Sequence, residues 1–392
     1  MNPRRFLSIL SLLVAAAPSP GLAQGCLSNT SNTGKGSNHT SINDNDGIQR
    51  LTVRWQRNDC ELRVDARGKF GVKSDLTGFT TIADGGYVDI EERDRDRERK
   101  VRVTSGAGGL QYRWTVDGES GFDVNRERWL ADILVAIERR TAMFAKSRVP
   151  ELVRQGGPNA VLDETNRMES AYAKRVYYTT LLGIARLDDV MLERMLRDGG
   201  ESITSDYERS ELLRAVAKQG PMSDKVTRAV IGVAQRMSSD YEKRRALSAG
   251  LESVNSNESR NALFTVASTM SSDYELAELL IAAQQRSMVD SLSRTAYFRA
   301  VDRLTSDYEH RRTLSALLKQ RPESPAILAD VLRSSEDIQS DYELSSLLVE
   351  FTRVVAVRGE LRELYLKAAK SISSDYEYRR ALQALLEQDR RS

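Results

Sequence analysis

The tetrapeptide Ser205-Asp206-Tyr207-Glu208 decides the fold of this chain, because it returns five more times at a nearly fixed interval. Successive copies are separated by 34, 33, 34, 34 and 34 residues, and a weaker copy, Ser170-Ala171-Tyr172-Ala173, lies 35 residues before the first. The later copies begin at Ser239, Ser272, Ser306, Ser340 and Ser374. Self-similarity at such a period is typical of stacked supersecondary units. The sequence therefore predicts a repeat architecture.

Each full copy has the spacing of a helix capping box, in which a Ser is followed three residues later by a Glu. The Ser hydroxyl then accepts from the third helical amide, and the Glu carboxylate accepts from the Ser amide. Asp, at the first helical position, faces the positive end of the helix dipole, and Tyr is left free to pack on a neighbouring helix. The predicted caps are Ser205, Glu208, Ser239, Glu242, Ser272, Glu275, Ser306, Glu309, Ser340, Glu343, Ser374 and Glu377. Six copies along a rod cannot converge on one substrate, so a structural role is favoured over a catalytic one.

The residues after each copy predict a helical hairpin. A leucine recurs seven residues after each Asp, at Leu213, Leu247, Leu280, Leu314, Leu348 and Leu382. Breaks follow at Gly220-Pro221, Asn255-Ser256-Asn257 and Arg321-Pro322, and Ser324-Pro325 reads as the start of a second helix. Residues 169–392 are therefore predicted to form a right-handed, HEAT-like α-solenoid of about six full helix pairs and a final single helix.

The N-terminal half shows a different periodicity. Apolar residues alternate with polar ones over short runs such as Leu51, Val53 and Trp55, and Gly-containing turns separate the runs. This pattern predicts a small antiparallel β-domain of six or seven strands over residues 47–120. Connecting helices are expected over 121–168, the first with an apolar stripe at Trp129 and the second ending at Gly156-Gly157-Pro158. The fold class is α+β multidomain.

The first 46 residues predict export. Arg4 and Arg5 precede a short apolar run and then Gly21-Leu22-Ala23, so residues 1–23 read as a signal peptide, and the mature chain as periplasmic or extracellular without a membrane span. An uncleaved anchor or lipid attachment at Cys26 is the alternative. Residues 24–46 are rich in Ser and Asn and are predicted to be disordered. The only two cysteines, Cys26 and Cys60, are expected to form a disulfide, although two independent thiols are also compatible with the sequence.

The composition and motifs of the sequence do not indicate a catalytic, metal-binding or nucleic-acid-binding site. The chain has 392 residues, a net charge of +2 and only two histidines, His39 and His310. No zinc motif or phosphate-binding loop is present, so no catalytic, metal or cofactor site is predicted. The charge gives no reason to expect nucleic acid as a partner.

Arginines follow the repeated tetrapeptide in alternate units. Five residues after each Asp the sequence has Glu211, Arg245, Glu278, Arg312, Ser346 and Arg380. The preceding residue adds Arg244, Arg311 and Arg379. One interpretation is a ladder of ion pairs between stacked helices. The other is a row that binds an acidic partner. We expect a division of labour, in which the first set pairs within the stack and Arg244, Arg311 and Arg379 face outward to a partner.

The repeated tetrapeptide, with a β-domain followed by Phe122-Asp123 and Trp129-Leu130, resembles HEAT-like helical repeats of bacterial exported proteins. The chain is similar to the extracytoplasmic regions attached to beta-lactam-sensor-like metallopeptidases, but it lacks their membrane-embedded peptidase segment and zinc motif. The resemblance implies a binding or sensing part without its effector. The leading hypothesis is a non-enzymatic exported scaffold that binds a protein or peptide. The alternative is a cell-envelope hydrolase with a site at the junction of the β-domain and the first repeats, where Tyr172, Tyr177 and Tyr178 cluster in the sequence.

Overall fold

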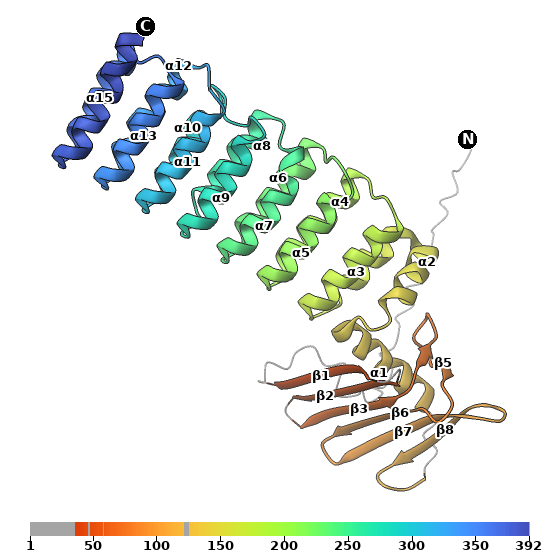
Figure 1. The fold of residues 1–392 in the computed structure, drawn as a ribbon. Coiled ribbons are helices and arrows are strands. Elements are labelled where there is room, and N and C mark those ends of the chain that lie inside the picture. Colours follow the sequence, from red (N-terminus) through yellow and green to blue (C-terminus); the bar gives the residue numbers. More distant parts are fainter. Residues whose placement is uncertain (1–35, 46–47, 58, 121–124, 392) are drawn as a thin grey trace, which may run out of the picture. The chain divides into compact units, whose positions relative to one another are not determined.

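The chain folds into an antiparallel β-sheet followed by a solenoid of paired helices, so the predicted fold class is confirmed (Figure 1). This computed structural model describes residues 36–45, 48–57, 59–120 and 125–391. The chain divides into two compact units between Ala136 and Ile137, inside helix α1 (Arg126–Thr141).

The β unit contains a six-stranded sheet in the order β1-β2-β3-β6-β7-β8, with antiparallel pairing throughout, and a separate hairpin of β4 and β5. The strands are β1 (Gly36–Asn45), β2 (Ile48–Arg57), β3 (Cys60–Arg67), β4 (Phe70–Val72), β5 (Phe79–Ile82), β6 (Tyr87–Asp94), β7 (Arg97–Gly106) and β8 (Gly109–Val116).

One face of this sheet is buried and the other is polar. In β3, Leu62 and Val64 are buried, whereas Arg63 and Asp65 between them are exposed, because successive side chains of a strand point to opposite faces. Trp129 of α1 is buried in this unit, and its indole Nε1 donates to the buried carboxylate of Glu92 at 2.7 Å. The alternating sequence therefore predicted a one-sided sheet correctly.

The prediction of disorder over residues 24–46 is wrong for Gly36–Asn45, which form strand β1 and pair with β2. An edge strand is held by backbone hydrogen bonds, so a polar composition does not prevent it. Asp46-Gly47 between the two strands is a hairpin signal that composition alone conceals. Residues 1–35, including the predicted signal peptide and Cys26, lie outside the described residues. Cys60 is buried at the start of β3, and the disulfide stays a prediction.

The second unit is helical. Its helices are α2 (Ala145–Thr165), α3 (Ala171–Ile184), α4 (Asp189–Ser202), α5 (Asp206–Ala217), α6 (Asp224–Gln235), α7 (Asp240–Gly250), α8 (Asn257–Ala267), α9 (Asp273–Gln284), α10 (Arg294–Val301), α11 (Asp307–Lys319), α12 (Pro325–Ser335), α13 (Asp341–Val354), α14 (Glu360–Lys370) and α15 (Asp375–Arg391), with a 3₁₀ turn at Leu251–Ser253. Helix α2 is kinked at Gly157, whose φ of 67° breaks the helical backbone where the sequence predicts a helix end.

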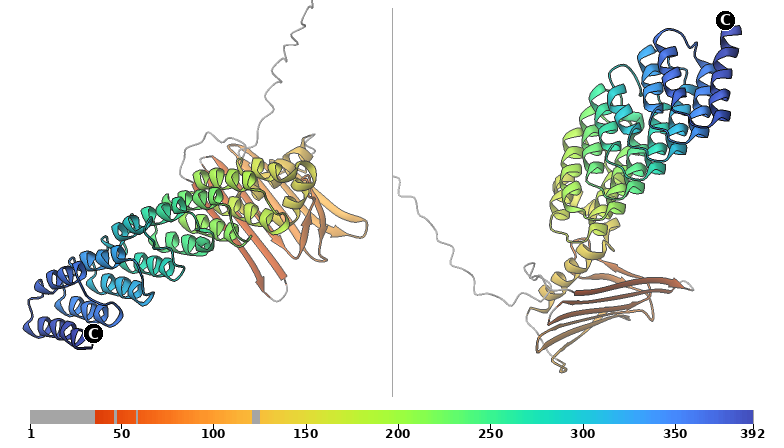
Figure 2. Two further views of the ribbon diagram at one scale, coloured as in Figure 1. Left: turned by 90° about the horizontal axis from the view of Figure 1, so that it is seen from above. Right: turned by 90° about the vertical axis from the view of Figure 1, so that its left-hand side faces the viewer.

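The helices form two layers. The first helices of the pairs lie side by side in one layer, and the second helices form the other (Figures 1 and 2). The first layer consists of α3, α5, α7, α9, α11, α13 and α15, and the second of α4, α6, α8, α10, α12 and α14. The predicted breaks lie between the two helices of a pair: Gly220-Pro221 separates α5 from α6, and Arg321-Pro322 separates α11 from α12.

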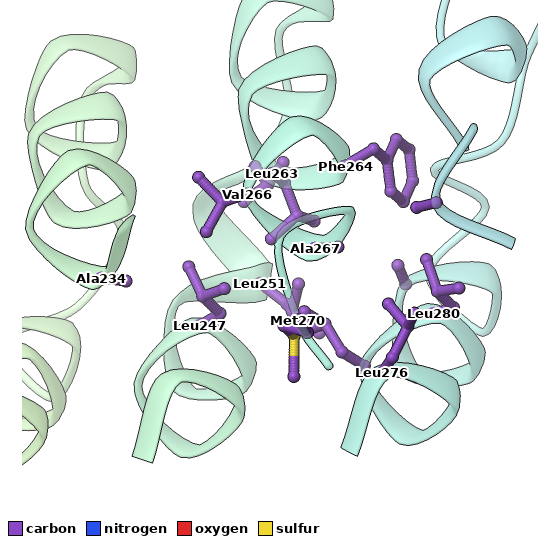
Figure 3. Close-up of a cluster of buried hydrophobic side chains, with 14 of the residues drawn as sticks. Ala234, Leu247, Leu251, Leu263, Phe264, Val266, Ala267, Met270, Leu276 and Leu280 are labelled. Carbon is purple, nitrogen blue, oxygen red and sulfur yellow. The ribbon is translucent and has the colours of Figure 1, made fainter. Parts of the chain in front are cut away.

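The core of the solenoid fills the space between the layers. The leucines that recur seven residues after Asp are fully or nearly fully buried in α5, α7, α9, α11 and α13. Around Leu247 and Leu280, side chains from α8 such as Leu263 and Phe264 complete one segment of this core (Figure 3). Neighbouring repeats share the cluster, so no single pair of helices could bury its own apolar face.

The repeated tetrapeptide caps the helices, but only half of the predicted capping box forms. In each full copy the Ser hydroxyl accepts from the Glu amide at 3.3–3.4 Å, as predicted. In the five later copies, however, the Ser amide donates to an aspartate of the preceding repeat and not to its own Glu; before Ser205 the equivalent position is Ala171. The five bonds, of 2.7–2.9 Å, are Asp206 with Ser239, Asp240 with Ser272, Asp273 with Ser306, Asp307 with Ser340 and Asp341 with Ser374.

The same aspartates bind the residue before each Ser. Asp240 accepts from the amide and the hydroxyl of Ser271 at 2.8 and 2.9 Å, in addition to the amide of Ser272. One carboxylate therefore satisfies two amides at the next helix N-terminus, which have no partner within their own helix. We call this series of five contacts between repeats the aspartate ladder.

Replacing Asp240 by Ala should lower the free energy of unfolding by about 2 kcal/mol, because hydrogen bonds to a charged group contribute roughly this much. Chemical denaturation monitored by circular dichroism measures the loss. Asp375→Ala is the matched control, since Asp375 also begins a helix but is 93% exposed. Equal losses for the two variants would contradict the ladder.

The ladder also predicts acid sensitivity. Burial by itself raises the pKa of Asp206 and Asp240, but hydrogen bonds from the next repeat outweigh it and hold the pKa of both carboxyls below the ordinary value. A depressed folded pKa contributes stability that is complete above the unfolded pKa of about 3.9 and is lost as pH falls through the folded pKa. The free energy of unfolding should therefore decrease below about pH 4. Asp240→Asn, which does not titrate, should show a shallower decrease; an unchanged slope would exclude Asp240 as a contributor.

Candidate functional site: an exposed tyrosine row

One tyrosine of every repeat is exposed, although the sequence predicts that it packs on a neighbouring helix. The exposed fractions run from 49% to 74%. We call the set the tyrosine row: Tyr172, Tyr207, Tyr241, Tyr274, Tyr308, Tyr342 and Tyr376. The prediction of packing is wrong because the second residue of each first helix lies on the surface, outside the core between the two layers.

Repetition fixes where these rings lie. Each full copy begins its helix at Asp, so its Tyr is always the second helical residue, and Tyr172 has the same place in α3. The first helices lie side by side in one layer (Figure 1). Equivalent residues of neighbouring helices therefore follow one another along the edge formed by the helix N-termini. The result is a line of half-exposed aromatic rings on one edge of the solenoid.

Arginine side chains stand over five of these rings. The guanidinium carbon lies 4.9 Å from the ring centre for Arg175 and Tyr172, and 5.5–5.9 Å for four further rings. At these distances a guanidinium is attracted by the electrons of the ring. The four further pairs are Arg244 with Tyr241, Arg311 with Tyr308, Arg312 with Tyr274 and Arg380 with Tyr342. The arginines thus restrain these five rings, about half of whose surface stays exposed.

The arginine set that was expected to pair within the stack does so. Arg245 binds Glu211 of the preceding repeat at 3.1 Å, and Arg312 binds Glu278 at 2.8 Å. Arg380 meets Ser346 at the equivalent place, with 3.2 Å between the guanidinium and the hydroxyl. Each of these arginines also binds the glutamate three residues earlier in its own helix, as Arg245 does with Glu242.

The arginines expected to face a partner are mostly engaged in the stack, so this part of the prediction is wrong. Arg244 forms an ion pair with Glu275 of the next repeat, and Arg311 forms one with Glu343; their side chains are only 24% and 23% exposed. Both glutamates belong to the repeated tetrapeptide. Each is predicted to accept from the Ser amide of its own copy, and each binds an arginine instead. Arg379 is different: it is 80% exposed and 4.0 Å from Asp375.

The two kinds of arginine bridge alternate along the solenoid. Forward bridges run from one repeat to the tetrapeptide glutamate of the next, and backward bridges return to the preceding repeat. The forward bridges are Arg175 with Glu208, Arg244 with Glu275 and Arg311 with Glu343. Each of these three arginines is therefore neutralised by a carboxylate, in contrast to the exposed Arg379.

A serine in the solenoid lies within hydrogen-bond distance of a histidine and of an aspartate, a set that is not predicted from the sequence. His310 Nε2 lies 2.9 Å from Ser334 Oγ, and that hydroxyl donates to Asp302 at 2.7 Å. In a hydrolase triad the histidine stands between the serine and the carboxylate, whereas here the serine stands between them. His310 and Ser334 are both buried, and burial lowers the pKa of His310. The cluster satisfies buried polar groups and is not arranged for nucleophilic attack.

The tyrosines named for a hydrolase site do not share one surface. Tyr177 and Tyr178 are fully buried, and only Tyr172, in the tyrosine row, is exposed. Tyr177 donates to the buried carboxylate of Glu138 at 2.6 Å, and the Tyr178 hydroxyl lies 3.0 Å from Thr165. Both side chains are therefore occupied in the core of the helical unit.

No known protein family matches this chain, and no curated protein matches it either. Over residues 36–45, 48–57, 59–120 and 125–391, no helix is long and apolar enough to cross a membrane. Within the same part of the chain, no group of three or more His, Cys, Asp or Glu side chains is placed to hold a metal ion.

The ion pair between Glu278 and Arg312 should show a small coupling. Its side chains are 35% and 27% exposed, and pairs of this kind contribute about 0.2–1 kcal/mol. A double-mutant cycle with Glu278→Ala and Arg312→Ala, measured by urea denaturation at low and high salt, tests this. The coupling should shrink as salt rises, and Arg379→Ser should leave stability unchanged. A coupling of zero at low salt would remove the pair from the stack's electrostatics.

Proposed function

We propose that this chain is a non-enzymatic, exported scaffold that binds a protein or peptide along the tyrosine row. The observation that carries the proposal is the exposure of one tyrosine in every repeat. Tyr172, Tyr207 and the five rings that follow contribute little to the core, since about half or more of each side chain is exposed. The cation–π contacts give five of these rings a modest role in the stack, but they leave a large aromatic surface in solvent at every repeat.

Tyrosine suits a binding surface. Its ring offers a large contact area with few rotatable bonds, and its hydroxyl can exchange hydrogen bonds with a partner, which is why tyrosine is enriched at protein interfaces. The cation–π contacts, such as that of Arg244 with Tyr241, reduce the freedom of the rings further before a partner binds. Less ordering is then needed on association.

The weak copy of the repeat separates the role of the tyrosine from that of its neighbours. In Ser170-Ala171-Tyr172-Ala173 both the Asp and the Glu of the tetrapeptide are replaced by Ala, but the Ser and the Tyr are kept. Ser170 still caps α3 by accepting from Ala173 at 3.2 Å. Tyr172 is 49% exposed and resembles the other rings of the row. The tyrosine therefore recurs where the aspartate ladder and its glutamate are missing.

The compartment and the relationship to other proteins belong to the same proposal. The positively charged, then apolar N-terminus supports export. The resemblance to HEAT-like repeats attached to beta-lactam-sensor-like metallopeptidases supports a binding or sensing role, in which this chain would supply recognition and leave any reaction to its partner.

Removing rings from the middle of the row should strongly reduce partner capture. The variant Tyr241→Ser, Tyr274→Ser and Tyr308→Ser deletes three neighbouring exposed rings. Affinity capture from an envelope extract, quantified by mass spectrometry, compares it with the unmodified chain. We expect the captured partner to fall at least about tenfold, since each lost aromatic contact costs roughly 0.5–1.5 kcal/mol.

The matched control deletes exposed apolar side chains elsewhere on the solenoid. Val190 and Leu292 are 70% and 63% exposed and do not belong to the row, so Val190→Ser with Leu292→Ser should capture the partner as the unmodified chain does. Circular dichroism verifies that both variants fold. If the tyrosine variant folds and captures the same proteins in the same amounts, the row is not the binding surface.

A further inference from the structure

We infer that the tyrosine row binds a proline-rich segment in the polyproline II conformation. This inference rests on the proposed function and specifies the chemistry of the partner. It is argued from the spacing of the rings, from their hydroxyl groups and from the charge beside them.

The spacing of the rings follows from the packing of the helices. Tyr241, Tyr274 and Tyr308 occupy the same position in α7, α9 and α11, which lie side by side (Figure 1). Packed helices have axes about 8–10 Å apart. Equivalent rings therefore repeat at about that distance along the edge. A partner that contacts every ring with the same kind of group must have the same repeat.

Among extended backbones, polyproline II has this repeat. It advances about 3.1 Å per residue with three residues per turn, so residues on one side recur at about 9.3 Å. Same-face residues of a β-strand recur at about 6.6 Å and drift out of phase with the rings after one or two contacts. One turn of an α-helix rises about 5.4 Å, which also fails to match.

The hydroxyl groups of the row favour the same ligand. A polyproline II segment forms no internal hydrogen bonds, and its carbonyl oxygens project as unpaired acceptors. A tyrosyl hydroxyl can donate to such a carbonyl while its ring packs against a proline, which is the way aromatic surfaces recognise proline-rich segments. The carbonyls of an α-helix already accept hydrogen bonds within the helix, so an α-helical partner would offer the hydroxyls of Tyr241 and Tyr274 no unpaired carbonyl acceptor.

The charge beside the row favours an uncharged ligand. Arg244 and Arg311 are paired with Glu275 and Glu343, so they offer no free positive charge to an acidic chain. A proline-rich segment carries no charge to be neutralised. Proline also fixes the backbone in advance, which lowers the entropy lost on binding to a line of shallow contacts. Seven rings with six intervals of about three residues each would accommodate about 18–21 residues.

The experiment uses the full chain and fluorescein-labelled oligoprolines of about 6, 9, 12 and 15 residues, because one polyproline turn is about three residues long. Fluorescence anisotropy gives Kd. We expect Kd to tighten about threefold to tenfold with each added turn, since each turn engages one more ring. Gly/Ser peptides of equal length are the control for non-specific binding and should not bind measurably over the same range.

Two substitutions in the row separate the ring from the hydroxyl. Tyr274→Ser should remove one step from the series for the longer peptides, and Tyr274→Phe should keep the ring contact and lose only the part carried by the hydroxyl. Because Tyr274 is 55% exposed, both variants should melt like the unmodified chain, which a thermal scan verifies. Equal binding of oligoproline by Tyr274→Ser and the unmodified chain would overturn the inference.

The outcomes distinguish this inference from the proposed function. If no oligoproline binds, or if Kd does not depend on length, while the triple tyrosine variant still loses its captured partner, the row binds a partner of another chemistry and the polyproline assignment is wrong. If neither oligoproline binding nor partner capture responds to the tyrosines, both the inference and the proposed function fail. A stepwise series that Tyr274→Ser shortens supports both.

Discussion

An aspartate carboxylate at the start of one helix holds the start of the next helix in the stack. A helix N-terminus has amides without partners inside the helix, and in an isolated helix water or a local side chain would satisfy them. Here Asp240 satisfies two such amides of the following repeat, at Ser271 and Ser272, and Asp307 does the same at Gln339 and Ser340. The same hydrogen bonds therefore satisfy the free amides at a helix N-terminus and fix the position of that helix against the preceding repeat.

Because the Ser amide is bound by an aspartate, the carboxylate of the tetrapeptide glutamate is available to bind an arginine. Glu275 binds an arginine from the preceding repeat, whereas Glu242 binds Arg245 of its own helix, which in turn reaches back to Glu211. The alternation of arginines along the sequence therefore corresponds to an alternation of forward and backward bridges. Exposed ion pairs contribute little singly, so we assign the stability of the stack chiefly to the shared leucine core and to the aspartate ladder.

The sequence predicts the solenoid well because its signals are local. Leucine spacing, Gly-Pro breaks and a Ser before each helix depend on neighbours within about one helical turn. The ladder could not be predicted in the same way, since the spacing of Ser and Glu is identical whether the Ser amide is bound by its own Glu or by Asp240 of another repeat. The outward orientation assigned to Arg244 failed for the same reason. Periodicity states which residues recur, but not which neighbour each one meets.

The tyrosine is the residue of the tetrapeptide with the most surface in solvent in the first five full copies. There Ser caps its helix, Asp holds the next repeat and Glu binds an arginine, whereas Tyr keeps about half or more of its surface exposed even where an arginine stands over its ring. In the weak copy Ala171 and Ala173 stand where the full copies have Asp and Glu, whereas the Ser and the Tyr are present. Ser170 keeps its capping bond there, and Tyr172 keeps its ring exposed, so the ring is available for an external contact in this unit as well. The regular helix spacing then makes that contact periodic, and a periodic partner such as a polyproline II segment can use all seven rings at once.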